Sequence, residues 1–301
     1  MSDKTSAWGE SPVVACTYGV SGLGKSVDLG YSFPRALFVA PPGALNSVQS
    51  VCGYQPEQVW VNTIPEVTEI IAGVRDRFKT VVIDEFSFLA EQTFSALEKK
   101  HSGFRLWGEL RDAALRFRDT SRYSGVNVIL ACWEQPPKIK HDGSRVRGGP
   151  LLSGKLPEQI PALCDVVLRA MHDTAARPWP AVYRCAADPN YVMKDRFDTA
   201  SVADPAPLNL AEILRASGLM VPRHPDLAKQ EEEVEIVASH LTGDVKGDTE
   251  QANTIYASLV KAGQPVSVAR WTLRDALDRA VLRRAKLASQ SVFLPSNNLL
   301  G

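Results

Sequence analysis

The sequence lacks any apolar stretch long enough for a membrane helix. None of its 301 residues lies in a run of about 18 apolar side chains, which is the length that crosses a bilayer. The first dozen residues also lack the apolar centre of a secretory signal peptide. We therefore expect a soluble, cytoplasmic protein that has no membrane partner.

Two further absences narrow the class of protein. Basic and acidic side chains number 34 each, so the formal net charge is zero. This balance excludes a protein that binds nucleic acid through an overall positive charge. The five cysteines are widely spaced and form no C-x-x-C pair, so the sequence indicates neither a disulfide framework nor a zinc site.

The composition is that of a globular protein, with 45% hydrophobic and 23% charged residues. Short runs rich in Val, Ile and Leu predict buried strands at residues 13–16, 36–40, 59–61, 80–83 and 126–130. Thr63 and Glu66 have capping-box spacing and begin a helix that we expect to run to about Phe78. We expect residues 91–120 to form another helix, with Gly103 as a possible break. This alternation predicts an α/β fold with a mostly parallel sheet.

The second half of the chain differs from the first in composition and in its predicted elements. Residues 136–155 are rich in Pro, Gly and basic side chains and predict a loop. Strands at 165–170 and 181–186, with a third at 191–194 after a turn, predict an antiparallel edge hairpin. A proline-rich break then separates a core domain, residues 1–221, from a small helical C-terminal region, residues 222–301. Within that region residues 226–250 carry eight acidic and two basic side chains, whereas 270–286 carry six basic and two acidic.

A glycine-rich run directly after the first strand matches the P-loop pattern G-x-x-x-x-G-K-[ST]. Its glycines let backbone N–H groups form an anion cradle at the start of a helix. Lys25 is expected to reach the β- and γ-phosphates of ATP, and Ser26 to ligate Mg²⁺. The predicted nucleotide-binding residues are Gly19, Val20, Ser21, Gly22, Leu23, Gly24, Lys25, Ser26 and Val27.

Two more strands end in polar side chains at the same predicted edge of the sheet. The strand at 80–83 leads into Asp84 and Glu85, which looks like a Walker B strand in which Asp84 holds the magnesium ion. Glu85 is the leading candidate to polarise the attacking water. The strand at 126–130 leads toward Glu134 and Gln135, either of which would sense the γ-phosphate. Glu134 is also the rival of Glu85 as the catalytic base.

The order of these motifs resembles the RecA-like core. Most closely it resembles the phage-encoded, AAA-type P-loop ATPases of the single-strand annealing and recombination group. The resemblance covers residues 11–218. It implies a RecA-like P-loop NTPase that hydrolyses ATP with Mg²⁺ and assembles as a homo-oligomeric ring or filament. It further implies action on single-stranded DNA in phage recombination or replication, in the host cytoplasm.

The resemblance also implies roles for basic residues. Related ATPases insert a Lys-Asn-Arg-Phe-Gly stretch into the neighbouring subunit's nucleotide site, and the matching stretch here reads Lys-Asp-Arg-Phe-Asp. Lys194 and Arg196 are therefore candidate catalytic fingers acting in trans, although the two aspartates depart from the pattern. The family's DNA-binding loop follows the sensor strand. Its basic residues here are Lys138, Lys140, Arg145, Arg147 and Lys155, without an aromatic residue among them, which favours contact with the phosphate backbone.

Three points stay open in the sequence. RecA carries its catalytic glutamate just past the second strand, but here that strand runs into Ala-Pro-Pro-Gly, so the base must come from Glu85 or Glu134. The C-terminal arginines could face nucleic acid in a helix-turn-helix or pack on the acidic segment 231–235, and the helices could recruit a recombination or replication protein. The P-loop also suits a small-molecule or nucleotide kinase with residues 136–155 as its lid, or a non-hydrolysing, ATP-gated adaptor.

Overall fold

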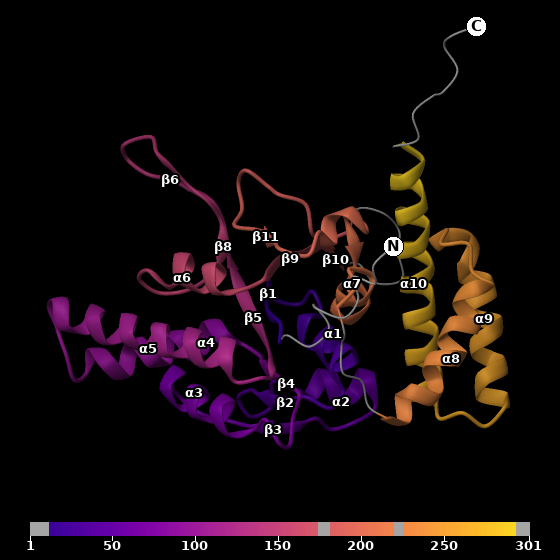
Figure 1. The fold of residues 1–301 in the computed structure, drawn as a ribbon, viewed down its shortest axis with the longest axis horizontal. Coiled ribbons are helices and arrows are strands. Elements are labelled where there is room, and N and C mark those ends of the chain that lie inside the picture. Colours follow the sequence, from indigo (N-terminus) through magenta and orange to yellow (C-terminus); the bar gives the residue numbers. More distant parts are fainter. Residues whose placement is uncertain (1–11, 174–180, 220–224, 293–301) are drawn as a thin grey trace, which may run out of the picture.

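The computed structural model describes residues 12–173, 181–219 and 225–292. One large sheet runs through its centre, with helices on both faces (Figure 1). The strand order along the sheet is β12-β10-β9-β1-β5-β4-β2-β3. These strands are β1 (Val14–Gly19), β2 (Leu37–Val39), β3 (Glu57–Val59), β4 (Thr80–Ile83), β5 (Asn127–Gln135), β9 (Val166–His172), β10 (Ala181–Arg184) and β12 (Ala206–Pro207).

The strands from β3 through β9 are parallel, and the edge beyond β9 is antiparallel. The predicted α/β fold with a mostly parallel sheet is therefore confirmed. The strand predicted at 191–194 is shorter and later, β11 (Lys194–Asp195), and it pairs with β9 rather than β10. The reason is that β10 covers only the last part of β9, from Arg169 onward, which leaves the first part free to pair with β11.

Two hydrophobic cores lie on opposite faces of the sheet, because alternate side chains of each strand point to opposite sides and helices cover both. In β1, Val14 and Cys16 belong to one core and Ala15 to the other. The first core lies under α3 (Ile64–Gly73), α4 (Phe86–Glu98), α5 (Gly103–Tyr123) and α6 (Leu156–Leu163). The second lies under α1 (Lys25–Ser32), α2 (Asn46–Cys52) and α7 (Leu210–Ala216).

The helix predictions hold with shifted boundaries. Thr63 and Glu66 form the predicted capping box, but α3 ends at Gly73 rather than at about Phe78. The helix predicted over 91–120 is two helices, α4 and α5. The break falls just before Gly103, whose φ of 58° is the left-handed conformation that glycine tolerates. Among the described residues, no helix has the length and apolarity required to cross a membrane.

The C-terminal region is helical, as predicted. It contains α8 (Pro225–Ser239), α9 (Val245–Lys261) and the long α10 (Val266–Val292), which share a small core of their own. Leu282 of α10 also belongs to the core beneath α1 and α2. The predicted division at residues 221 and 222 falls outside the described residues, so the boundary stays a prediction.

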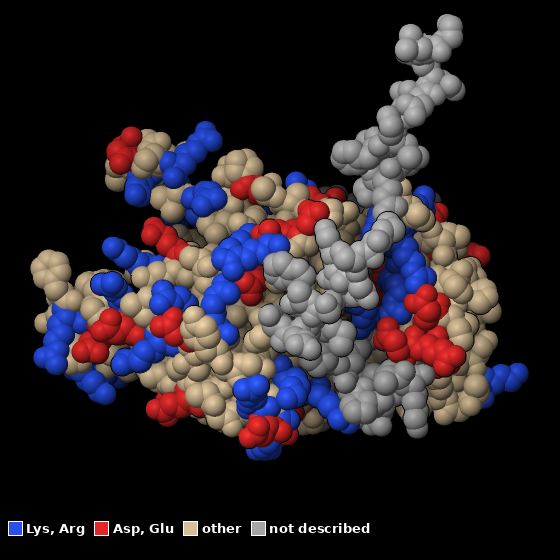
Figure 2. Space-filling model, in the orientation of Figure 1, with Lys and Arg blue, Asp and Glu red and all other residues tan. Residues whose placement is uncertain are grey.

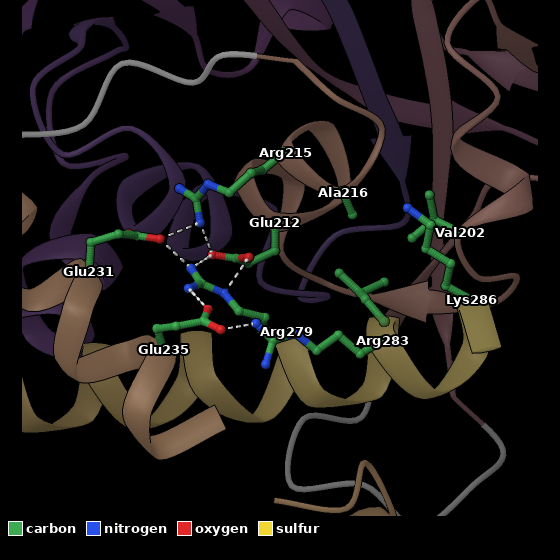
Figure 3. Close-up of a pocket in the computed structure, with 10 residues that line it drawn as sticks. Val202, Glu212, Arg215, Ala216, Glu231, Glu235, Arg279, Arg283 and Lys286 are labelled. Atoms are coloured by element: carbon green, nitrogen blue, oxygen red, sulfur yellow. Dashed lines mark hydrogen bonds and ion pairs between the residues drawn. The ribbon is translucent and has the colours of Figure 1, made fainter. Parts of the chain in front are cut away.

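Three arginines of α10 form ion pairs with acidic groups, whereas Arg270 and Arg284 of the same helix are exposed. Arg274 is buried and forms an ion pair with Asp28 of α1 at 3.0 Å. Arg279 lies between Glu212 of α7 and two glutamates of α8 (Figure 3). Arg283 also pairs with an α8 glutamate, Glu235. Opposite charges separated in the sequence thus meet inside the fold, where the acidic segment supplies the partners.

Candidate nucleotide-binding site

The P-loop joins β1 to α1 at the carboxyl end of the parallel strands. Gly22 and Gly24 both have a φ of 85°, a left-handed conformation that favours glycine. A Cβ placed on Gly19 would lie 2.5 Å from the carbonyl oxygen of Ala170 in β9, whereas one on Gly22 would meet no atom of the described residues within 4 Å. The glycines thus permit this backbone path and leave open space in front of the α1 N-terminus, which suits an anion.

The ammonium group of Lys25 lies among backbone carbonyls and carboxylates. Its Nζ donates to the carbonyl oxygens of Gly19 at 2.8 Å and Val20 at 2.9 Å. Burial lowers the pKa of Lys25, and the negative charges of Asp84, Glu134 and Glu85 oppose that shift. Three carboxylates from the ends of two different strands therefore act on one lysine, as expected if β1, β4 and β5 end at one edge of the sheet.

Asp84 lies at the end of β4 and is only 3% exposed. Ser26 lies near enough to its carboxylate to lower the pKa of Asp84, and no described residue donates a hydrogen bond to its Oδ2. Burial raises the pKa of Asp84 to about 6, against the opposing effects of Ser26 and Lys25. Hard cations such as Mg²⁺ prefer carboxylate and hydroxyl oxygens. Ser26 and Asp84 therefore fit the predicted magnesium site.

Glu85 follows directly and adopts an unusual backbone conformation. It is the N-cap of α4 in the left-handed region, with φ 59° and ψ 41°. That conformation is unfavourable in free energy for a residue other than glycine. Backbone strain of this kind is concentrated at functional sites. Its charge raises the pKa of both Asp84 and Lys25, so its half-buried carboxylate lies close to the candidate metal and phosphate sites.

Glu134 is held by a residue that the sequence reading missed. Arg169 of β9 donates from Nε to Glu134 Oε2 at 2.8 Å and from Nη2 to Oε1 at 2.9 Å, a bidentate ion pair. The guanidinium also stacks over the Tyr191 ring, 3.6 Å from its centroid. Tyr18 and Gly19 of β1 lie beside Arg169 and Trp133, so the pair spans β1 just where the P-loop begins. The signal in the sequence was one charge within an otherwise apolar strand, residues 166–171.

Lys194 and Arg196 lie away from the P-loop of their own chain. Lys194 is level with Val167 of β9, which is itself beside Cys16 near the start of β1. Its Nζ donates to the carbonyl oxygen of Ala162 at 2.7 Å. The Arg196 guanidinium is 3.0 Å from Asp165 and remains 49% exposed. The P-loop follows the other end of β1, so these two cations are not part of the nucleotide site that their own chain builds.

The predicted basic loop is a β-hairpin. Strands β6 (Lys138–Ile139) and β7 (Arg145–Val146) pair antiparallel and project from the end of β5 (Figure 1). Figure 2 shows Lys and Arg side chains gathered on this projection. Four of the five predicted basic residues are exposed on or beside it: Lys138, Lys140, Arg145 and Arg147. The fifth, Lys155, stands apart as the N-cap of α6.

Comparison with known proteins is consistent with this geometry. Residues 11–197 match the sequence model of the AAA domain family. Among solved structures, a KaiC-like protein from the hyperthermophilic archaeon Pyrococcus horikoshii OT3 shares 15% identity, with a TM-score of 0.38, over 61% of this chain and 83% of its own. That distant likeness says nothing about activity. A comparison with curated proteins found no match. The family match contains every candidate residue described above, from Gly19 through Arg196.

Proposed function

We propose that this chain, which belongs to the AAA domain family of P-loop ATPases, hydrolyses ATP with Mg²⁺ on single-stranded DNA. The oligomer would be a ring or filament, and the process phage recombination or replication. The observation that carries the ATPase assignment is the convergence of Lys25 and Ser26 with Asp84 and Glu85 at one sheet edge. A glycine-rich turn that binds nothing would not need a buried carboxylate near enough to a buried lysine to shift its pKa.

Each residue has a definite task in this proposal. Backbone N–H groups of the P-loop bind the phosphates, and Lys25 exchanges its carbonyl partners for phosphate oxygens. Ser26 and Asp84 hold Mg²⁺, which supplies positive charge against the charge that develops on the transferred phosphoryl group. Arg169 orients Glu134, so that the Glu134 carboxylate is fixed at the start of the P-loop.

We assign the catalytic base to Glu85 rather than to Glu134. Both oxygens of Glu134 accept hydrogen bonds from Arg169, so this carboxylate is held by the arginine and not directed at a water molecule. Glu85 has a half-buried carboxylate and a strained backbone beside Asp84. A carboxylate next to a metal-bound phosphate is placed to accept the proton of the attacking water.

Steady-state ATPase kinetics of two matched variants test this assignment. Glu85→Gln is expected to lower kcat by roughly 10²–10⁴-fold, the usual contribution of a general base, and to leave the affinity for ATP nearly unchanged. Glu134→Gln is expected to lower kcat less, because its role is to position groups near the P-loop. The opposite order of effects would place the base at Glu134.

The β6–β7 hairpin is the proposed DNA contact. Its exposed cations and lack of aromatic side chains suit the phosphate backbone rather than base stacking. Neutralising Arg145 and Arg147 together to Gln should weaken single-stranded DNA binding. It should also reduce the slope of log K against log salt by about 1.4, since each lost phosphate contact removes about 0.7. Fluorescence anisotropy at several salt concentrations measures both quantities.

The control for that variant is a second pair of exposed cations on the opposite edge of the sheet. Arg77 and Lys79 precede β4, whereas the hairpin follows the carboxyl end of β5. Changing both to Gln removes the same charge, and DNA affinity should change little. Equal losses in the two variants would mean that only overall charge matters and that the hairpin is not the contact.

The experiment that tests the function as a whole is the rate of ATP hydrolysis by the purified chain, measured without DNA, with single-stranded DNA and with duplex DNA. We expect hydrolysis that needs Mg²⁺ and is stimulated most by single strands, and none from Lys25→Ala. Transfer of phosphate to a nucleoside monophosphate in place of its release would identify a kinase. Tight ATP binding with negligible turnover would identify an ATP-gated adaptor.

A further inference from the structure

We propose that the C-terminal helix α10 positions the P-loop, with Arg274 as the positioning residue that connects the two. The inference rests on the proposed nucleotide binding and adds a role for a helix outside the family match, which ends at residue 197. The ion pair and hydrogen bonds of Arg274 are to residues outside the glycine-rich run 19–26. It acts through Asp28, which lies in the P-loop helix α1, and through Leu208, which lies near the loop itself.

The first connection runs through Asp28, three residues after Lys25 in α1. Its carboxylate is buried and is held from separate parts of the chain. Tyr183 of β10 donates to Oδ2 at 2.7 Å, Arg274 donates to Oδ1 at 3.0 Å, and the backbone N–H of Leu210 is 3.3 Å from Oδ1. Burial raises the pKa of Asp28, and the Arg274 charge lowers it again. The positive charge of Arg274 thus stabilises the ionised form of a buried carboxyl group in α1, the helix that begins with Lys25.

The second connection reaches the P-loop itself. The Arg274 guanidinium also donates to the carbonyl oxygen of Leu208. A Cβ on Gly24 would lie 3.8 Å from a methyl carbon of the Leu208 side chain, so Leu208 lies near the last glycine of the loop. One planar guanidinium therefore fixes both the helix after the P-loop and the residue that packs on the loop. Both hydrogen bonds come from the same nitrogen of the group, Nη2.

The remaining contacts make α10 a firm support. The Arg274 guanidinium lies over the Tyr31 ring of α1, 4.4 Å from its centroid. Trp271, one turn earlier, packs edge-on against the same tyrosine at 6.0 Å and against Tyr54 at 5.6 Å. Farther along, Arg279 bonds to Glu212 of α7 and to α8, in the charged cluster of Figure 3. The helix is therefore fixed on both sides of Arg274.

Such a connection has a thermodynamic consequence. If docking of α10 holds the P-loop in the arrangement that binds phosphate, docked α10 raises the affinity for ATP. Bound ATP must then stabilise the docking of α10 by the same free energy. A connection that only stabilises the fold would change the melting temperature and leave nucleotide affinity unaltered in protein that remains folded.

The test measures both directions of this coupling in the full-length chain. The variants are Arg274→Lys, Arg274→Met, and Arg274→Met combined with Asp28→Asn, which removes the buried carboxylate at 3.0 Å together with its arginine in case the single variant fails to fold. Affinity for a fluorescent ATP analogue with Mg²⁺ is titrated well below each melting temperature. Hydrogen exchange of α10 amides is followed with and without ATP.

We expect the dissociation constant to rise about tenfold in the double variant, within the range typical of coupled sites, and less in Arg274→Lys. ATP should slow exchange in α10 of the wild type and lose most of that effect in the double variant. The control is Arg284→Met, because Arg284 is on the same helix, is 59% exposed and has its nearest acidic partner, Asp244, at 3.9 Å. Its dissociation constant should match the wild type.

Two outcomes would contradict the proposed role of Arg274, and they can be distinguished from each other. Folded Arg274 variants that bind the analogue as tightly as the wild type, with unchanged ATP protection of α10, overturn the positioning role alone. A wild-type chain that binds no nucleotide overturns the proposed function, and the positioning role with it.

Discussion

Replacing Asp84 by Ala is expected to abolish magnesium-dependent ATP hydrolysis. A bound metal stabilises the transferring phosphoryl group by several kcal/mol, and each 1.36 kcal/mol is tenfold in rate, so kcat should fall by roughly 10³-fold or more. The physical basis is the buried Asp84 Oδ2, to which no described residue donates a hydrogen bond, beside Ser26. Steady-state rates across a range of Mg²⁺ concentrations measure the loss.

The stability of a second variant, Asp84→Asn, separates a metal ligand from a structural residue. The folded-state pKa of Asp84 is raised to about 6, above its value of about 4 in an unfolded chain. The stability that this group contributes is therefore present at acidic pH and is lost as the pH rises through about 6. In magnesium-free buffer Asp84→Asn should be more stable than wild type at pH 8, by about 2–3 kcal/mol.

That difference in stability should shrink to a few tenths of a kcal/mol near pH 4, where the wild-type carboxyl group is protonated in the folded state and about half protonated in the unfolded state. Urea unfolding at the two pH values measures it. An Asn variant that is less stable than wild type at pH 8 would show that Asp84 holds the fold together. The role that we assign to it would then fail, even if hydrolysis were lost.

The second large effect is expected from Arg196→Ala, which should bind ATP normally and lose turnover. Fingers of this kind contribute roughly 10³–10⁵ to kcat in related nucleotide hydrolases. In this structure Arg196 lies beside Asp165, away from its own P-loop and half exposed. As a catalytic finger, Arg196 must therefore reach the nucleotide of a neighbouring subunit. Lys194, which donates to Ala162, is the companion residue for the same test.

Mixing variants tests whether the finger acts in trans. Arg196→Ala lacks the finger and Lys25→Ala lacks the site, so a mixed oligomer contains some interfaces with both intact. Partial recovery of activity on mixing is the expected result. The matched control is Arg122→Ala, because Arg122 pairs with the same Asp165 at 3.3 Å and should keep its turnover. Loss of activity in both variants with no rescue would make Arg196 a structural partner of Asp165.

The sequence predicted the α/β fold and the position of the P-loop after the first strand, but not how the strands pair at the antiparallel edge. A P-loop has strict spacing because each glycine and the lysine have one geometric task, so Gly19 through Ser26 could be placed by pattern alone. The pairing of β11 with β9 depended on how much of β9 the strand β10 leaves uncovered. No local pattern records that. Arg169 was missed for a similar reason, since its partner Glu134 is 35 residues away in the chain.

The distribution of charge shows most clearly what the sequence determines and what the tertiary structure determines. The sequence by itself determined that positive and negative charges are segregated along the chain, and that a P-loop precedes two strands ending in carboxylates. Only the tertiary structure decided which charged side chains form ion pairs within the fold and which stay exposed. Arg274 and Arg279 of α10 are paired with Asp28, Glu212 and the glutamates of α8, whereas the cations of the β6–β7 hairpin remain exposed. The reason is that a buried charge must find an opposite partner, and folding brings such partners together from segments that are far apart in the chain.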